Sequence, residues 1–305
     1  MCDNKHFLFI FADKIAKRTM DSIADWIDAK PPRGKYTFTR EEVVAAFPRM
    51  KTEVISTTLS REVKKGRIMI PQQGFYVIIP DEYKLRGFTP QPFYLDDLMK
   101  YLGRRYYVAL LSAGSYHGAA HQAPMTFCVM TEPPTMREKR TQKYATRFFY
   151  RSAIPMEYVE QRQTQTGVIN VSSPELTAID LVTYQERAGS ITRAATVLAE
   201  LVEKTDFGRL APEFVKVAPV ACFQRLGYIL ETVLEEQEAA DAVGDLLKRA
   251  GVRLQTAALK VGKDTSGAEL DKKWKILVNE TIEIETATAL FGRHRLGAGA
   301  GRANP

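Results

Sequence analysis

The succession of helix and strand signals between residues 19 and 79 constrains the fold of this chain more than any other feature of its sequence. Apolar residues at helical spacing over 19–29 predict a helix. The sequence PPRG at 31–34 ends it, because proline cannot continue a helix and glycine permits a turn. Residues 36–38 are a short extended stretch. The sequence TREE at 39–42 has the spacing of a capping box and predicts the start of a second helix.

A third helix and a β-hairpin complete this segment. The helix is predicted over 52–65, since Gly66 is a natural C-terminal stop. Two strands are predicted at 67–70 and 75–79, joined by the turn sequence PQQG. The order helix, short strand, helix, helix, β-hairpin is that of a winged helix-turn-helix, and we predict this fold for residues 1–80.

The outward face of the 52–65 helix carries the most specific functional signal. If Val54, Ile55, Leu59 and Val63 form the buried stripe, the opposite face is short, polar and positively charged. Such a face suits the major groove of DNA, where Ser and Thr reach bases or phosphates and Arg can bind guanine through two hydrogen bonds. The predicted DNA-binding residues are Lys51, Thr52, Ser56, Thr57, Ser60, Arg61, Lys64, Arg67, Gln72 and Gln73.

Position along the chain distinguishes the expected roles of these residues. Lys51 and Thr52 lie at the start of the helix, where backbone N–H groups favour a phosphate. Arg67 and the Gln72–Gln73 tip of the hairpin are expected to be wing contacts to the DNA backbone or minor groove.

Charge is distributed unevenly along the 305 residues. Residues 1–79 hold 14 Lys and Arg against 9 Asp and Glu, whereas residues 80–285 hold 26 against 27. Residues 49–67 alone hold six basic against two acidic side chains. A basic segment attracts polyanions through phosphate neutralisation and counterion release, which supports DNA binding. A solvated helix face on a winged protein-interaction module is the alternative explanation.

The rest of the chain is predicted to hold a second domain, so the expected class is α+β. Residues 81–93 contain Gly and Pro and are interpreted as a linker, 94–285 as a mixed α/β domain, and 286–305 as a disordered tail. The predicted helices span 94–102, 104–118, 174–186, 190–204, 212–234 and 236–250, and the predicted strands span 125–131, 146–151, 156–162, 168–172, 252–260 and 274–284.

Cysteine content and hydropathy exclude several classes of protein. Cys2, Cys128 and Cys222 lie far apart with no C-x-x-C pair, so no cysteine-built zinc site can form and a reducing compartment is indicated. No run of about 18 apolar residues predicts a membrane span. The early apolar run ends at Asp13 and is followed by Lys17-Arg18, so we expect a cytoplasmic protein rather than an exported one.

Four segments in the second domain carry a family resemblance. YYVALLSAGSYHG at 106–118 predicts a helix that ends in His-Gly, and VSSPELTAIDL follows at 171–181. RLGYILE at 225–231 and WKILVN at 274–279 complete the order. Behind a winged domain, this succession resembles the AbiEi family of antitoxins from abortive-infection phage-defence systems, over roughly residues 19–285.

The resemblance implies a function in two parts. Members of this family are autorepressors that bind inverted operator repeats upstream of their own operon. Their C-terminal domain is associated with neutralising a partner toxin, AbiEii, which is similar to nucleotidyltransferases. The family is usually classed as type IV, in which toxin and antitoxin need not form a stable complex.

Enzymatic interpretations find little support in the sequence. His117-x-x-x-His121 has helical metal-ligand spacing, but Gly118 lies between the two and no third ligand is near. Gly114-Ser115 is a feature of nucleotidyltransferases, yet the Asp-x-Asp pair that holds Mg²⁺ in those enzymes does not follow. We predict no catalytic residue, no metal and no cofactor. The alternative is a DNA-tethered nuclease or phosphotransferase with its active site in 94–285.

Most polar residues of the second domain receive a structural interpretation. Ser173 is predicted to cap a helix, Asp180 to pair with a basic residue such as Arg225, and Arg225 to brace the core. The near-neutral charge of this domain argues against RNA masking as the route of toxin neutralisation, which leaves a contact surface. The candidate contact residues share one predicted loop and strand: Arg137, Lys139, Arg140, Lys143 and Tyr144.

Overall fold

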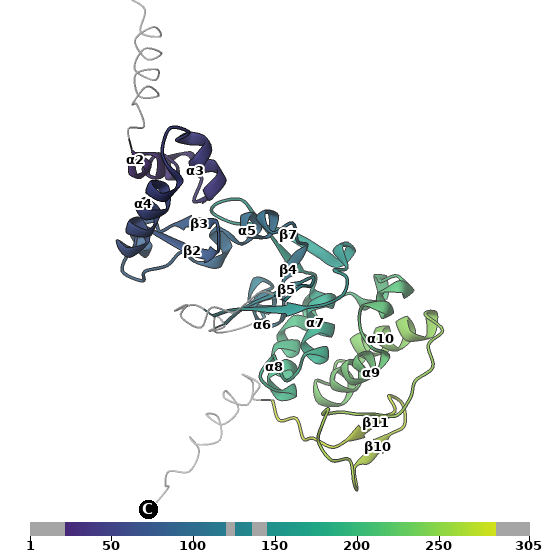
Figure 1. Ribbon diagram of the computed structural model, residues 1–305. Helices are drawn as coiled ribbons and strands as arrows, with labels where there is room; N and C mark the ends of the chain where they lie inside the picture. The colour runs from purple at the N-terminus through teal and green to yellow at the C-terminus, as the bar shows by residue number, and fades with distance from the viewer. Residues whose placement is uncertain (1–21, 120–125, 136–144, 285–305) are drawn as a thin grey trace, which may run out of the picture. The chain divides into compact units, whose positions relative to one another are not determined.

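The computed structural model describes residues 22–119, 126–135 and 145–284 (Figure 1). These residues form helices and three separate sheets, so the predicted α+β class is confirmed. Within the described residues, no helix is both long and apolar enough to cross a membrane.

Contacts divide the chain into two compact units. Unit 1 comprises residues 1–104 with 163–169, and unit 2 comprises 105–162 with 170–305. Unit 1 contains a three-stranded antiparallel sheet in the order β1-β3-β2. Its described elements are α2 (Ile23–Asp28), β1 (Thr37–Thr39), α3 (Arg40–Ala46), α4 (Thr52–Lys64), β2 (Ile68–Gln72), β3 (Phe75–Ile78) and α5 (Leu95–Tyr101), with 3-10 helices at Pro31–Arg33, Asp81–Tyr83 and Gln91–Phe93.

Side-chain caps start two of the helices of unit 1. Thr39 Oγ1 accepts a hydrogen bond from the Glu42 backbone N–H at 3.2 Å, and Glu42 Oε2 accepts one from the Thr39 N–H at 2.9 Å. The predicted capping box at the start of α3 is therefore confirmed. Ser22 caps α2 in a similar way, since its Oγ accepts from the Asp25 N–H at 3.1 Å.

One apolar cluster joins α2, α3 and α4 to the sheet of unit 1. Ile55 and Leu59 of α4 pack in this cluster with Phe38 of β1. The sequence placed Val54 in the same buried stripe, and this prediction is wrong because Val54 is 48% exposed. Glu62 takes the buried position instead, which binary hydropathy cannot anticipate because a carboxylate is buried only when it is paired.

The sheet of unit 1 is covered on both of its faces. Tyr76 and Ile78 belong to the cluster beneath α4, whereas Phe75 and Val77 belong to a second cluster with Leu98 of α5. Successive strand residues point to opposite faces, so all four residues of β3 are buried. Helix α5 therefore covers the face of the sheet that points away from α4.

This packing bears on the segment predicted as a linker. Within residues 81–93, Phe88, Thr89, Gln91 and Phe93 are buried. The units divide after Arg104, later than the boundary predicted at residue 94. The Pro and Gly content of residues 81–93 predicts irregular backbone, but it cannot show whether that backbone is buried in the fold.

Unit 2 contains a five-stranded sheet in the order β6-β5-β4-β8-β7 and a small sheet in the order β10-β11-β9. Helices α6, α7 and α8 pack together, as do α9 and α10 (Figure 1). The elements are β4 (Tyr106–Val108), α6 (Leu110–Tyr116), β5 (Thr126–Thr131), β6 (Ala145–Tyr150), β7 (Val159–Gln163), β8 (Val168–Ser172), α7 (Pro174–Thr183), α8 (Ile191–Leu201), α9 (Val220–Tyr228), a π-helix (Ile229–Val233), α10 (Gln237–Arg249), β9 (Ala257–Ala258), β10 (Glu269–Asp271) and β11 (Ile276–Val278).

Three predicted elements of unit 2 differ in the structure. The helix predicted over 104–118 is strand β4 followed by the shorter helix α6, whose first residue, Leu110, has a φ of +53°. A continuous apolar run cannot distinguish a buried strand from a buried helix. The long strands predicted at 252–260 and 274–284 shrink to β9 and β11, since most of their residues form irregular backbone.

Candidate functional site

The exposed face of α4 gathers most of the predicted DNA-binding residues. Thr57, Arg61 and Lys64 are exposed and lie within about 60° of one another around the helix, given about 100° per residue. Lys51, Thr52 and Ser60 are also exposed. The buried residues Ile55, Leu59 and Glu62 occupy the opposite side. The amphipathic division predicted from sequence therefore holds for these six residues.

Ser56 differs from its neighbours on α4 because its hydroxyl is engaged within unit 1. Its Oγ accepts a hydrogen bond from Arg40 Nη2 at 2.8 Å and donates one to the Thr52 carbonyl at 2.9 Å. The residue is half-buried. These bonds connect α3 to α4 and make Ser56 a residue that fixes the angle between the helices.

Arg67 is committed to an ion-pair network. Its Nη1 lies 2.6 Å from Oε2 of the buried Glu62, and its Nη2 pairs with Asp28. Partial burial lowers the pKa of the Arg67 guanidinium, but Asp28 and Glu62 outweigh it and raise the pKa overall. Lys65 Nζ adds a third contact, 2.9 Å from Glu62 Oε1. The network ties the end of α4 to α2 and to the start of β2, so we leave Arg67 out of the candidate interface.

The tip of the β2–β3 hairpin presents one of its two glutamines. Gln73 is exposed, whereas Gln72 is half-buried and ends β2. The Gln73 carbonyl accepts a hydrogen bond from the Tyr101 hydroxyl of α5 at 3.2 Å. Gly74 has a φ of +78°, which favours glycine, and a Cβ there would lie 2.6 Å from that hydroxyl and displace it. Helix α5 thus holds the hairpin tip in place.

The candidate toxin contacts cannot be located. Arg137, Lys139, Arg140, Lys143 and Tyr144 lie outside the described residues.

A buried polar cluster occupies the interior of unit 2. The Tyr107 hydroxyl donates to Asp180 Oδ2 at 2.7 Å and accepts from Arg151 Nη1 at 2.7 Å. Burial raises the pKa of Asp180 to about 6, although Arg151 and Tyr107 act in the opposite direction. The sequence predicted that Asp180 pairs with a basic residue, with Arg225 as the example. The basic partner is present but is Arg151, whose Nη1 lies 3.5 Å from the carboxylate.

Arg225 and Gln224 of α9 are also buried, and both donate to main-chain carbonyls. Arg225 Nε binds the Ala258 carbonyl at 2.8 Å, and Gln224 Nε2 binds the carbonyls of Gln255 and Trp274 at 2.8 and 2.6 Å. The interpretation of Arg225 as a bracing residue is confirmed. Ser173 caps α7 as predicted, accepting from the Leu176 N–H at 3.2 Å.

Nothing in the described part of the chain assembles a metal site. No group of three or more His, Cys, Asp and Glu side chains comes together there. The ring Nε2 of His117 lies 2.7 Å from the Ser172 carbonyl oxygen, and His121 lies outside the described residues.

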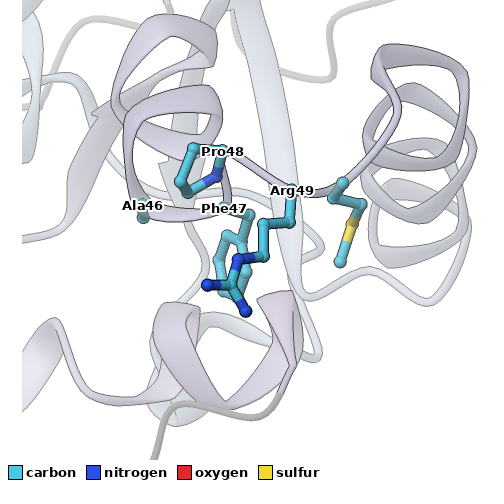
Figure 2. A pocket seen from close by; sticks show the side chains of 5 residues that line it. Ala46, Phe47, Pro48 and Arg49 are labelled. Atoms are coloured by element: carbon cyan, nitrogen blue, oxygen red, sulfur yellow. The ribbon is translucent and has the colours of Figure 1, made fainter.

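A shallow hollow lies at the turn between α3 and α4. It measures about 470 Å³ and is lined by residues 46–50 (Figure 2). Figure 2 shows the side chains of Phe47 and Arg49 among those that line it. Its lining residues include one aromatic ring and one cation, and no carboxylate or nucleophile is among them.

The site and fold together define an α+β protein with an exposed basic helix in one unit and a buried polar framework in the other. Comparison with known proteins identifies the second unit: residues 107–232 match the model of the AbiEi antitoxin C-terminal domain. The family predicted from sequence is thereby confirmed, and the chain carries an antitoxin domain of the AbiEi family.

Structural comparison extends the similarity of the fold beyond this domain. The crystal structure of the RV2827C protein from Mycobacterium tuberculosis matches with a TM-score of 0.58 and 14% identity, covering 88% of this chain and 93% of that chain. At this identity the match concerns the fold alone. No match was found among curated proteins.

Proposed function

We propose that this chain is the antitoxin of a phage-defence toxin–antitoxin system and also represses its own operon. In this proposal unit 1 is a winged helix-turn-helix: α3 and α4 are the paired helices, and the β2–β3 hairpin is the wing. The observation that carries the proposal is the exposed face of α4, where Arg61 and Lys64 flank Thr57 opposite the packed side.

The chemistry of this face fits DNA. Recognition helices place polar and basic side chains against base edges and phosphates, and Arg supplies the most frequent specific contact, to guanine. Gln73 at the wing tip can reach a groove edge or the backbone. Inverted operator repeats upstream of the operon are the proposed target, as the family resemblance implies.

Unit 2 is proposed to neutralise the partner toxin in the cytoplasm. The family resemblance implies a nucleotidyltransferase-like toxin and an antitoxin that need not form a stable complex with it. The buried polar side chains of Tyr107, Asp180 and Arg225 hydrogen-bond to one another or to main-chain carbonyls and so brace the fold, which favours a contact surface over a catalytic one. Residues 137–144 stay the candidate surface.

Binding of the full chain to the DNA that precedes its own coding sequence tests repression. The double variant Arg61→Ala/Lys64→Ala is expected to bind at least tenfold more weakly, because a base-reading Arg contributes about 1–3 kcal/mol. Lys204→Ala/Lys216→Ala, which removes two exposed charges from unit 2, is the matched control and should bind normally. Equal affinity of the wild-type chain for that DNA and for a shuffled duplex would contradict specific repression.

Expression of the same double variant from a foreign promoter tests whether the two activities are separable. Cells that carry the toxin should still survive, because the substitutions lie in unit 1 only. Loss of protection by a folded and abundant variant would mean that neutralisation depends on DNA binding. A covalent adduct on toxin recovered from these cells would instead favour the alternative of an enzyme.

A further inference from the structure

Val54 is an apolar side chain in the middle of a polar surface. It is 48% exposed, while Ile55 and Leu59 of the same helix are buried. Its position in the first turn of α4 leaves it outside the apolar cluster that anchors the helix. About half of this valine side chain is left open to a partner from outside the chain.

The geometry of α4 places Val54 beside the residues proposed to read DNA. At about 100° per residue, Val54 and Arg61 lie only about 20° apart around the helix, two turns from each other along it. Thr57 lies about 60° from Val54, one turn away. The three side chains therefore form one row on the exposed face, with Val54 at its N-terminal end. Recognition helices contact base edges with their N-terminal residues.

Only one base offers an apolar group in the major groove, and that group is the C5-methyl of thymine. Resting on the proposed DNA-binding function, we infer that Val54 contacts a thymine methyl group and specifies a thymine in the operator. The charge around it favours DNA over an apolar protein partner, since Lys51, Arg61 and Lys64 are all exposed on the same segment. An apolar protein surface would remove water from those cations without offering them an opposite charge, which is unfavourable, whereas DNA offers phosphates.

The test removes the methyl group from the DNA and shortens the side chain on the protein. The probe is the shortest duplex from the DNA preceding the coding sequence that the full chain still binds. Each thymine in it is replaced in turn by deoxyuridine, which lacks only the C5-methyl. At one position wild-type affinity should fall about three- to fivefold, the loss expected for one methyl group removed from an apolar contact.

Val54→Ala makes the assignment specific. This variant should bind the thymine duplex about three- to fivefold more weakly and show no further loss with deoxyuridine at that position. Val44→Ala is the matched control, because Val44 is a 40% exposed valine on α3, and it should keep the full deoxyuridine effect. Circular dichroism confirms folding, and Val54→Thr, which keeps one methyl and the β-branched shape, should retain part of the effect.

Two results overturn the inference while leaving repression intact. The first is specific binding that is insensitive to deoxyuridine at every thymine. The second is a deoxyuridine effect of the same size in Val54→Ala as in the wild-type chain. Absence of any specific binding would instead reject the proposed function, so the two failures are distinguishable.

Discussion

Helices α4 and α9 carry similar residue types and use them in opposite ways. Helix α4 buries only Ile55, Leu59 and Glu62, and most of its polar residues are exposed, Arg61 and Lys64 among them. Helix α9 buries every residue from Cys222 to Tyr228, including Gln224 and Arg225. An arginine on α4 is therefore available to a partner, whereas the arginine on α9 is a structural donor. Residue type alone does not assign the role of an arginine. The role depends on whether the helix that carries it has an exposed face, as α4 does, or is buried all round, as α9 is over 222–228.

The inward polar residues of α9 explain how residues 255–274 are held. Their acceptors are carbonyls of Gln255, Ala258 and Trp274, all beyond residue 232, where the family match ends. Trp274 Nε1 also donates to Glu231 Oε2 at 2.5 Å. The small sheet is thus attached to the antitoxin domain by side chains from the matched segment, and we regard it as part of the same folding unit.

The largest expected effect comes from Gly227 on α9. A Cβ at this position would lie 2.1 Å from Cζ3 of the fully buried Trp274 ring, so Gly227→Ala cannot be accommodated without displacing the indole. We expect a loss of about 3 kcal/mol in the free energy of unfolding of unit 2, at the upper end of overpacking costs. Urea denaturation followed by tryptophan fluorescence measures it.

Gly244 provides the matched control for this prediction. A Cβ there would meet the same ring at 3.6 Å, an ordinary contact, and the residue lies inside α10. Gly244→Ala should therefore stabilise the protein by roughly 0.5–1 kcal/mol through helix propensity. Combining Gly227→Ala with Trp274→Leu should recover part of the loss. A destabilised Gly244→Ala would show that the ring has less room than the structure indicates.

The next effect compares the two arginines directly. Arg225→Met keeps the aliphatic length but leaves the Ala258 carbonyl without its donor, so it should cost about 1–3 kcal/mol in stability. Arg61→Met on the exposed face should change stability by less than about 0.5 kcal/mol. DNA affinity should show the reverse order, with a loss for Arg61→Met and none for Arg225→Met.

Hydrogen exchange locates the defect in Arg225→Met. The amide of Leu259, which donates to the Leu277 carbonyl at 2.9 Å, should exchange faster while amides of α4 keep their protection. Weakened DNA binding by a fully folded Arg225→Met variant would contradict the separation of roles between α4 and α9.

The sequence predicts those parts of the fold that depend on residues close together in the chain. The capping box at Thr39 and the helix stop at Gly66 act within a few residues, so their consequences were predictable. The strand β4 was missed because Tyr106, Tyr107 and Val108 are all buried, and only the neighbouring strands fix their conformation. Burial of the whole strand removes the alternation that would have revealed it.

The candidate site was predictable in outline but not in detail. Helical spacing located Thr57, Arg61 and Lys64 correctly on the outward face. Spacing could not show that Arg67 pairs with the buried Glu62. Both side chains are charged, and hydropathy predicts that charged side chains are exposed to solvent. It also could not show that Val54 is exposed, since hydropathy assigns a valine to the core whatever its surroundings.

The smallest expected effect separates two adjacent lysines at the end of α4. Among the described residues no ion pair is formed by Lys64, whereas Lys65 Nζ lies 2.9 Å from Oε1 of Glu62. Lys64→Gln should lower the slope of log K against log salt by about one, because one phosphate contact is lost, and should weaken binding to all sequences alike. Lys65→Gln should change the slope less, because its charge is already partly neutralised in the free protein. Titrations at several salt concentrations measure both slopes. Equal changes for the two variants would mean that the basic face of α4 acts as a diffuse charge, and the contrast with the fixed donors of α9 would then rest on Arg61 alone.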